Sequence, residues 1–386
     1  MADLTVLPVP GGEAVLELLP HLRSVLDGTA APALPVPADD VREQRRLVDA
    51  LAPGTPIDPS TAMVLATSGS TGIPKGALLT ADALRASAAA THARLGGPGR
   101  WLLALPAHHI AGMQVVLRSL AAGFDPAVVD VQAGFDPADL TRSIASMTDS
   151  RRYTSLVPTQ LIKALDHPDA VAALASLDAV LLGGAATPAP VLARAVDAGI
   201  TVVRTYGMTE TCGGCVYDGA PLDGVRVRLD DDGRVVLGGP TLANGYRGLS
   251  DHPAFADSGW FRTDDLGRLQ DGRLQILGRL DDAITSGGLT VVPRVVEESA
   301  ARVDGVAECV VVGVPDERLG ERVGALVVLR PGSSATAESI RESVAADLGA
   351  AAAPRQVVLV AALPLRGPGK VDRTAARRLL SESRNP

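Results

Sequence analysis

Short apolar runs alternate with helix-like patterns through the central part of the chain. Apolar runs of roughly four to eight residues between turn signals are typical of buried strands, and alternation with helices is typical of a largely parallel sheet. The predicted strands are Thr61–Thr67, Trp101–Leu105, Ala127–Val131, Thr154–Val157, Ala179–Leu182 and Thr201–Thr205. We therefore predict an α/β fold with layered sheets.

The segment that precedes about Ser60 has little regular pattern. It predicts one helix, over Gly12–Leu26, because five of its apolar residues follow helical spacing. These residues are Ala14, Val15, Leu18, Leu19 and Leu22.

After Gly219 the pattern changes to short strands separated by Asp-Gly turns, which indicates a small antiparallel β region. Its predicted strands are Val225–Leu229, Val235–Leu237 and Leu274–Leu277. A polar, glycine-containing stretch then leads into an α+β tail. The tail's predicted elements are the strands Glu308–Val314 and Arg322–Leu329 and the helices Ser339–Leu348 and Thr374–Ser381. We predict a large domain over residues 1–280 and a small domain over 281–386.

Composition limits the classes of function. The 386 residues carry a net charge of −8, which disfavours nucleic acid as a partner, because phosphate binding needs a basic face. No apolar run approaches the roughly 18–20 residues of a membrane span. The first twenty residues contain no Lys or Arg, so they do not resemble a targeting peptide. With only three cysteines, the chain fits a reducing, cytoplasmic compartment.

Two of the cysteines, Cys212 and Cys215, form a single C-x-x-C motif. A zinc site needs a second pair or two suitably spaced histidines, and neither lies near in the sequence. A redox pair needs a thioredoxin-like setting, whereas this pair interrupts a glycine-rich stretch. We expect both cysteines to be small structural loop residues.

The strongest chemical signal is the sequence TSGSTGIPKG at residues 67–76, directly after a predicted strand. Its glycines and hydroxyls leave backbone N–H groups and O–H groups available to phosphate oxygens, and Lys75 adds a positive charge. The stretch is not a Walker A loop, because Pro74 precedes the lysine and Gly76 follows it. Taken alone, it is also compatible with an ordinary Ser/Gly surface loop.

Four further motifs follow in order. They are YGMTET at 206–211, GWFRTDDL at 259–266, GRLDD at 278–282 and LPLRGPGKVDR at 363–373. Together with the first motif they resemble the acyl-adenylate-forming superfamily of AMP-dependent synthetases and ligases, over Thr61 to Arg373. The resemblance implies a large N-terminal domain for ATP and the acyl group. It also implies a small mobile C-terminal domain that carries a catalytic lysine.

The resemblance implies roles for individual residues. The residues expected to contact the ATP phosphates are Thr67, Ser68, Gly69, Ser70, Thr71, Gly72 and Lys75. Ala185 and Tyr206 would flank the adenine, Gly207 would also contact the nucleotide, and Thr209 would contact the α-phosphate. Glu210 would associate with Mg²⁺, Asp265 would bind the ribose, and Arg279 would contact ribose and phosphate. Asp281 would be the hinge, and Lys370 would reach the carboxylate and α-phosphate. Because the attacking carboxylate and ATP are both anions, Lys370 and Mg²⁺ would stabilise the charge that builds at the α-phosphorus.

Within the superfamily, the branch of o-succinylbenzoate–CoA ligases of menaquinone biosynthesis is the most similar. The short leading segment and the sequence LPAHHIAGM at 105–113 support this branch. The implied partners are o-succinylbenzoate, ATP, Mg²⁺ and CoA. The oligomeric state is left open, with a homodimer as one alternative. The residues expected around the acid are His109, Arg118, Val157, Gly183, Gly184, Arg204 and Met208. The second carboxylate of the acid would need a cation, for which Arg118 and Arg204 are the two alternatives.

Several alternatives stay open on the sequence alone. Asp264 stands where the superfamily usually has glycine, so either it or Asp265 could bind the ribose; we choose Asp265. The acid could be another acyl or aryl acid, and the thiol could belong to a carrier protein. A degenerate nucleotide-binding module is a third alternative, against which Lys370 argues. The remaining histidines without a motif are expected to be surface groups: His21, His92, His167 and His252.

Overall fold

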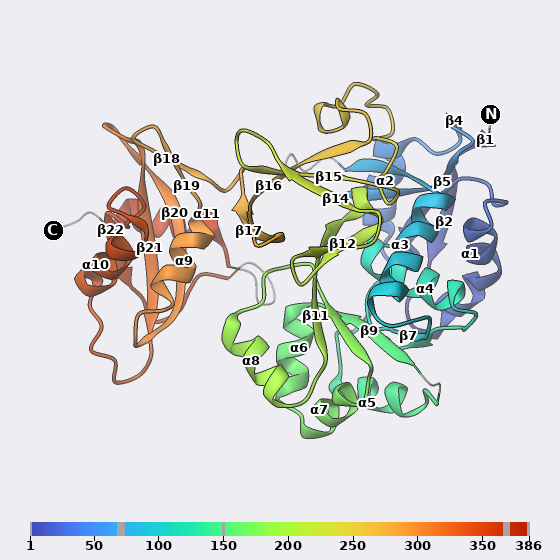
Figure 1. Cartoon of the computed structure of the whole chain (residues 1–386), viewed down its shortest axis with the longest axis horizontal. Helices are drawn as coiled ribbons and strands as arrows, with labels where there is room; N and C mark the ends of the chain where they lie inside the picture. Colours follow the sequence, from blue (N-terminus) through green and yellow to red (C-terminus); the bar gives the residue numbers. More distant parts are fainter. Residues whose placement is uncertain (1, 68–73, 149–150, 366–370, 384–386) are drawn as a thin grey trace. The chain divides into compact units, whose positions relative to one another are not determined.

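The chain divides into two units (Figure 1). The structure is a computed structural model that describes residues 2–67, 74–148, 151–365 and 371–383. The larger unit holds residues 1–228, 236–263 and 269–274, and the smaller unit holds 229–235, 264–268 and 275–386. Within the described residues, no helix is both long and apolar enough to cross a bilayer.

A four-stranded sheet begins the larger unit. In spatial order its strands are β2 (Thr5–Val9), β3 (Ala33–Pro37), β5 (Thr61–Thr67) and β6 (Lys75–Thr80). The first three strands are parallel and β6 is antiparallel to β5. The same part of the chain contains two short strands that pair with each other, β1 (Ala2–Asp3) and β4 (Pro56–Ile57). It also contains the helices α1 (Leu19–Leu26), α2 (Val41–Leu51) and α3 (Ala81–Arg94).

This sheet corrects the reading of the leading segment. The segment supplies two strands, and the predicted helix Gly12–Leu26 divides into the 3₁₀ helix η1 (Gly12–Leu18) and α1. Strands β2 and β3 were not predicted because both contain proline, which is usually absent from the interior of a sheet. Strand β3 contains Pro35 and Pro37 and is nevertheless fully buried.

A seven-stranded sheet forms the centre of the larger unit. Its order is β13 (Ala220–Pro221), β12 (Gly213–Tyr217), β11 (Val202–Met208), β10 (Ala179–Leu182), β9 (Arg152–Leu156), β7 (Arg100–Leu103) and β8 (Ala127–Val128). The strands from β11 to β8 are parallel. The helices of this region are α4 (Ile110–Ala121), α5 (Pro137–Ala145), α6 (Pro158–Leu165), α7 (Pro168–Ala175) and α8 (Ala189–Asp197). The α/β prediction is confirmed, and β5 and β10 have the predicted bounds.

Helices cover both faces of this sheet. Leu102 and Val180 pack into a cluster with residues of α5 to α8, such as Leu161. The neighbouring residue Trp101 points to the other face, where the guanidinium of Arg118 on α4 lies 5.2 Å from its ring centroid. Burial on both faces explains why these strands are continuous apolar runs in the sequence.

The small β region is a four-stranded sheet with the order β14 (Arg226–Leu229), β15 (Arg234–Gly238), β16 (Trp260–Gln270) and β17 (Arg273–Arg279). Of two short 3₁₀ helices, η2 (Thr209–Thr211) precedes this sheet in the sequence and η3 (Pro253–Phe255) lies between β15 and β16. The predicted strands of this region are present. Strand β16, which contains both aspartates of the GWFRTDDL motif, was not predicted.

The tail forms the α+β arrangement that was predicted. Its strands are β19 (Leu289–Val291), β18 (Ile284–Ser286), β21 (Gly320–Leu329), β20 (Val306–Asp316) and β22 (Gln356–Leu359), and its helices are α9 (Pro293–Ala300), α10 (Ala337–Leu348) and α11 (Arg373–Glu382). Val311 packs with residues of α9 and α10, whereas Val310 and Val312 pack with residues of α11. The hinge expected at Asp281 stays a prediction.

Candidate functional site

The phosphate-loop motif joins two antiparallel strands. Thr67 at the end of β5 lies opposite Lys75 at the start of β6. The loop thus leads into a strand and not into a helix, in agreement with the exclusion of a Walker A loop. The other residues predicted to meet the phosphates lie outside the described residues: Ser68, Gly69, Ser70, Thr71 and Gly72.

Lys75 contacts a histidine far away in the sequence. Its Nζ atom lies 3.1 Å from Nε2 of His252 and 5.3 Å from the ring centroid of Tyr246. The two rings form a T-shaped pair with centroids 4.7 Å apart. The expectation that His252 is a surface group without neighbours is therefore wrong. The sequence could not show this contact, since 177 positions separate the lysine from the histidine.

The carboxylate expected to associate with Mg²⁺ is buried and held in place. Glu210 lies in η2, and the Tyr246 hydroxyl donates to its Oε1 over 2.5 Å. The described residues contain no group of three or more potential metal ligands. Mg²⁺ is commonly bound by one or two carboxylates together with substrate phosphates. The single buried carboxylate of Glu210, which is hydrogen-bonded to Tyr246, fits such an ion.

The hairpin of β11 and β12 carries the rest of the YGMTET motif. A Cβ atom at Gly207 would lie 2.2 Å from the carbonyl oxygen of Gly213, so only glycine fits there. Tyr206 and Met208 are half-buried on β11, and Thr209 is buried directly after them. The conformation of this motif is therefore set by close contact between two backbones.

The glycines expected beside the acid follow strand β10. Gly184 has a positive φ of 81°, and a Cβ atom there would lie 3.3 Å from Cγ1 of Val157. The structure thus brings Val157 and Gly184 together, as the resemblance implies. Gly183 is half-buried, and Ala185, expected to flank the adenine, is exposed.

Arg118 is a buried cation on α4. Its side chain lies over Trp101, the residue is 3% exposed, and its Nε has no hydrogen-bond partner within the described residues. No carboxylate of the described residues forms an ion pair with it. An isolated buried charge is costly unless a partner of opposite charge binds to it. This environment makes Arg118 a candidate for binding an anion.

Gln114, one turn before Arg118, is a candidate site residue that sequence reasoning missed. It is 1% exposed, and neither polar atom of its amide has a hydrogen-bond partner within the described residues. Gly213 lies against both side chains: a Cβ atom there would be 3.4 Å from Cγ of Gln114 and 3.8 Å from Nη2 of Arg118. The start of β12, two residues after the YGMTET motif, thus borders a buried cation and a buried amide.

The second candidate cation, Arg204, has a different environment. It is exposed, and its Nε atom lies 3.0 Å from Oδ1 of Asp218 in a surface ion pair. A cation that already has a solvated carboxylate partner has little need of another anion. Of the two alternatives we retain Arg118.

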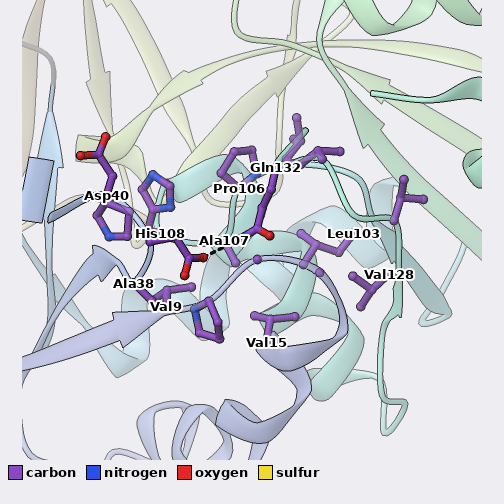
Figure 2. A pocket seen from close by; sticks show the side chains of 18 residues that line it. Val9, Val15, Ala38, Asp40, Leu103, Pro106, Ala107, His108, Val128 and Gln132 are labelled. Atoms are coloured by element: carbon purple, nitrogen blue, oxygen red, sulfur yellow. Dashed lines mark hydrogen bonds between the residues drawn. The ribbon is translucent and has the colours of Figure 1, made fainter. Parts of the chain in front are cut away.

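His109 occupies the N-cap position of α4, and its neighbour His108 lines a separate cavity of about 500 Å³ (Figure 2). Burial lowers the pKa of His108 to about 4. Two carboxylates, Asp39 and Asp40, also line the cavity, and none of the described lining residues is Lys or Arg. This environment disfavours an anionic acid, so the acid is not expected in this cavity.

Both aspartates of the GWFRTDDL motif lie in the smaller unit. Asp265 of β16 is buried, whereas Asp264 is exposed and lies 3.1 Å from Nη1 of Arg234. Arg279 lies 3.9 Å from Oδ1 of Asp265 and forms a two-point pair with the predicted hinge residue Asp281, at 2.8 and 2.9 Å. The hydrogen bond to Asp281 raises the pKa of Arg279. The predicted catalytic residue Lys370 lies outside the described residues.

The two cysteines are core residues. Both are fully buried, and burial raises their thiol pKa values, that of Cys215 to about 12. Cys215 lies in β12, so the expectation of a loop position is wrong for it. A buried thiol with a raised pKa is unreactive, which agrees with the structural role.

Comparison with known proteins gives consistent matches along the chain. Residues 9–247 match the family described as AMP-binding enzyme, and residues 295–370 match the AMP-binding enzyme C-terminal domain. A probable 2-succinylbenzoate–CoA ligase of Mycobacterium tuberculosis is 51% identical over 98% of this chain and all of that protein. The medium/long-chain-fatty-acid–CoA ligase FadD8 of the same organism is 34% identical over 97% of this chain and 67% of its own length.

A solved structure extends the similarity to the fold. The MenE protein of E. coli, with a bound phenylether-linked analogue of OSB-AMS, has a TM-score of 0.78 and 26% identity. The match covers 99% of this chain and 89% of the E. coli chain.

Proposed function

The chain belongs to the AMP-binding enzyme family, and from that membership we propose that it is a 2-succinylbenzoate–CoA ligase. The acid would react with ATP to form an acyl-adenylate and pyrophosphate, and the thiol of CoA would then displace AMP. The aliphatic carboxylate is the reacting group. The ring carboxylate is a spectator anion that the protein must bind.

The observation that carries the choice of acid is the buried guanidinium of Arg118. It has no carboxylate partner within the described residues and lies next to the unpartnered amide of Gln114. A simple fatty acid would leave both groups without a partner, at a cost of roughly 1–3 kcal/mol for each buried polar group. An acid with a second carboxylate satisfies them. Arg118 would pair with this carboxylate, and the Gln114 amide would donate to it.

The segments around this pair fit the two-step reaction. Gly213, which borders Arg118 and Gln114, lies three residues after Glu210, so the proposed acyl and Mg²⁺ positions are adjacent in the chain. Lys75 and a cation at Glu210 would neutralise the phosphates, and Lys370 would act on the α-phosphate during adenylation. Bound Mg²⁺ supplies Lewis-acid stabilisation of the leaving pyrophosphate.

The assignment of the other residues rests on the same proposal. His109 at the start of α4, together with Val157 and Gly184, would line the acyl site, and Asp265 would bind the ribose. We propose a cytoplasmic location for the protein, as expected for an enzyme that uses ATP and CoA.

The test compares two acids. The matched pair is 2-succinylbenzoate and 4-oxo-4-phenylbutanoate, which lacks the ring carboxylate. Because the second acid leaves the cation and the amide unpaired, we expect its kcat/KM to be lower by at least roughly 10²-fold. In Arg118→Met the kcat/KM values for the two acids should differ by no more than about tenfold. Equal turnover of both acids by the unmodified protein would refute the choice of substrate and favour a general aryl-acid ligase.

A further inference from the structure

We infer that Tyr246 is a positioning residue for ATP binding: its hydroxyl orients the carboxylate of Glu210 for Mg²⁺, and its ring supports the ammonium group of Lys75. The inference rests on the proposed function, since it takes ATP with Mg²⁺ as the substrate that these two groups meet. Tyr246 lies in none of the five motifs from which the site was predicted.

Backbone hydrogen bonds hold Tyr246 between η2 and β6. Before it in the chain, the N–H of Ala243 donates to the carbonyl oxygen of Glu210 over 2.8 Å. After it, the N–H of Arg247 donates to the carbonyl oxygen of Gly76 in β6, also over 2.8 Å. These bonds join main-chain atoms, so they remain when the side chain of Tyr246 is replaced.

The hydroxyl of Tyr246 fixes a buried carboxylate. Tyr246 is 6% exposed and Glu210 is 7% exposed, and the hydroxyl donates to Oε1 of Glu210 over 2.5 Å. An ionised carboxylate has about four lone-pair positions, so an oxygen that accepts one hydrogen bond can still bind a cation. Groups that orient a metal-binding side chain in this way typically change metal affinity by about 10–100-fold when they are removed.

The ring of Tyr246 contacts the other charged group of the site. Nζ of Lys75 lies 5.3 Å from the ring centroid, a distance at which a cation is attracted to the face of an aromatic ring. Phe255 packs against the same ring with centroids 5.2 Å apart, and Phe261 packs against Phe255 at 4.9 Å. The hydroxyl and the ring of one residue thus act on two different groups, and substitution can separate them.

The experiment measures the dissociation constant of ATP by calorimetry, once with Mg²⁺ and once with EDTA, in the absence of any acid. Tyr246→Phe removes the hydroxyl and keeps the ring, whereas Tyr246→Leu removes both. The matched control is Tyr217→Phe, because the hydroxyl of Tyr217 is also buried and is hydrogen-bonded to Thr91 over 3.0 Å. Thermal unfolding verifies that each variant is folded.

We expect Tyr246→Phe to bind ATP with Mg²⁺ about tenfold or more weakly, and ATP with EDTA within about twofold of the unmodified protein. Tyr246→Leu should also bind ATP with EDTA about threefold or more weakly, because Lys75 has lost its aromatic neighbour. Tyr217→Phe should stay within about twofold under both conditions, since its hydroxyl contacts neither Glu210 nor Lys75.

A double substitution tests whether the hydroxyl acts through Glu210. Glu210→Gln should weaken the binding of ATP with Mg²⁺, and adding Tyr246→Phe should change this affinity by less than about twofold. A further loss of tenfold in the double variant would overturn the inference, as would unchanged affinity with Mg²⁺ in Tyr246→Phe.

An equal loss with Mg²⁺ and with EDTA in Tyr246→Phe would also overturn the inference, because it indicates a merely structural role. These affinities are measured without an acid, so they do not depend on which acid the protein activates. Equal turnover of the two acids would refute the proposed substrate and leave the result for Tyr246 standing.

Discussion

Replacement of Asp265 by alanine tests the position of the ribose. In β16, Asp265 is buried and its side chain is 13% exposed, whereas the side chain of the adjacent Asp264 is 58% exposed. Asp264 also pairs with Arg234 over 3.1 Å. Alternation of side chains along a strand therefore makes only one of the two carboxylates the inward-facing one.

The expected magnitude follows from these environments. A carboxylate that accepts from two ribose hydroxyls makes two charge-assisted hydrogen bonds of roughly 1.5–3 kcal/mol each. The lower end of that range, about 3 kcal/mol in total, corresponds to roughly a 10²-fold weaker affinity for ATP in Asp265→Ala. Asp264→Ala removes an exposed ion pair, for which about 0–1 kcal/mol of stability is typical. Its ATP affinity should change by less than about threefold.

The assay is the dissociation constant of ATP and of 2′-deoxy-ATP for each variant. In the unmodified protein the deoxy nucleotide should bind more weakly, because it lacks one of the two hydroxyls. In Asp265→Ala the two nucleotides should bind with nearly equal affinity, and in Asp264→Ala the original difference should persist. A larger loss of ATP binding in Asp264→Ala would refute the reasoning and move the ribose contact by one residue.

Two further predictions concern the lysine of the tail and His92, which is buried, so the expectation that it is a surface group is wrong. Lys370→Ala should lower adenylation by at least about 10²-fold, while added acyl-adenylate is still converted to the thioester; an equal loss in both half-reactions would contradict a role in adenylation alone. Burial lowers the pKa of His92 to about 4, so the unfolded chain binds the extra proton first and stability falls as pH decreases from about 6.5 to 4. In His92→Gln, the free energy of unfolding measured with denaturant should lose a part of this pH dependence on the order of 2–3 kcal/mol. A pH profile identical to that of the unmodified protein would contradict the prediction.

Much of the fold could be predicted because buried strands need apolar residues. Thr61–Thr67 and Ala179–Leu182 are continuous apolar runs, and both have the predicted bounds. Strand β16 was missed because its inward positions include Thr263 and Asp265, so its sequence has no apolar alternation. A polar residue that is buried for a chemical purpose removes the signal by which a strand is predicted.

The candidate site was predictable where contiguous residues form a motif, and not where distant residues meet. Glu210 could be selected from YGMTET, but the hydroxyl that donates to it comes from Tyr246, 36 positions away. Gln114 has an ordinary position on a helix, and only its burial without a hydrogen-bond partner distinguishes it. Such contacts depend on how the sheets pack, which short-range patterns do not encode.

The packing of Arg118 on Trp101 gives the protein an internal optical reporter. Only two tryptophans are present, and Trp260 lies apart from this site, beside Arg226 and Arg228. Trp101 is fully buried, its indole N–H donates to His92, and a guanidinium lies over its ring. The emission of an indole responds to charge near its ring. An acid that neutralises Arg118 therefore changes the fluorescence of Trp101, so that its arrival can be followed in real time without label, nucleotide or turnover.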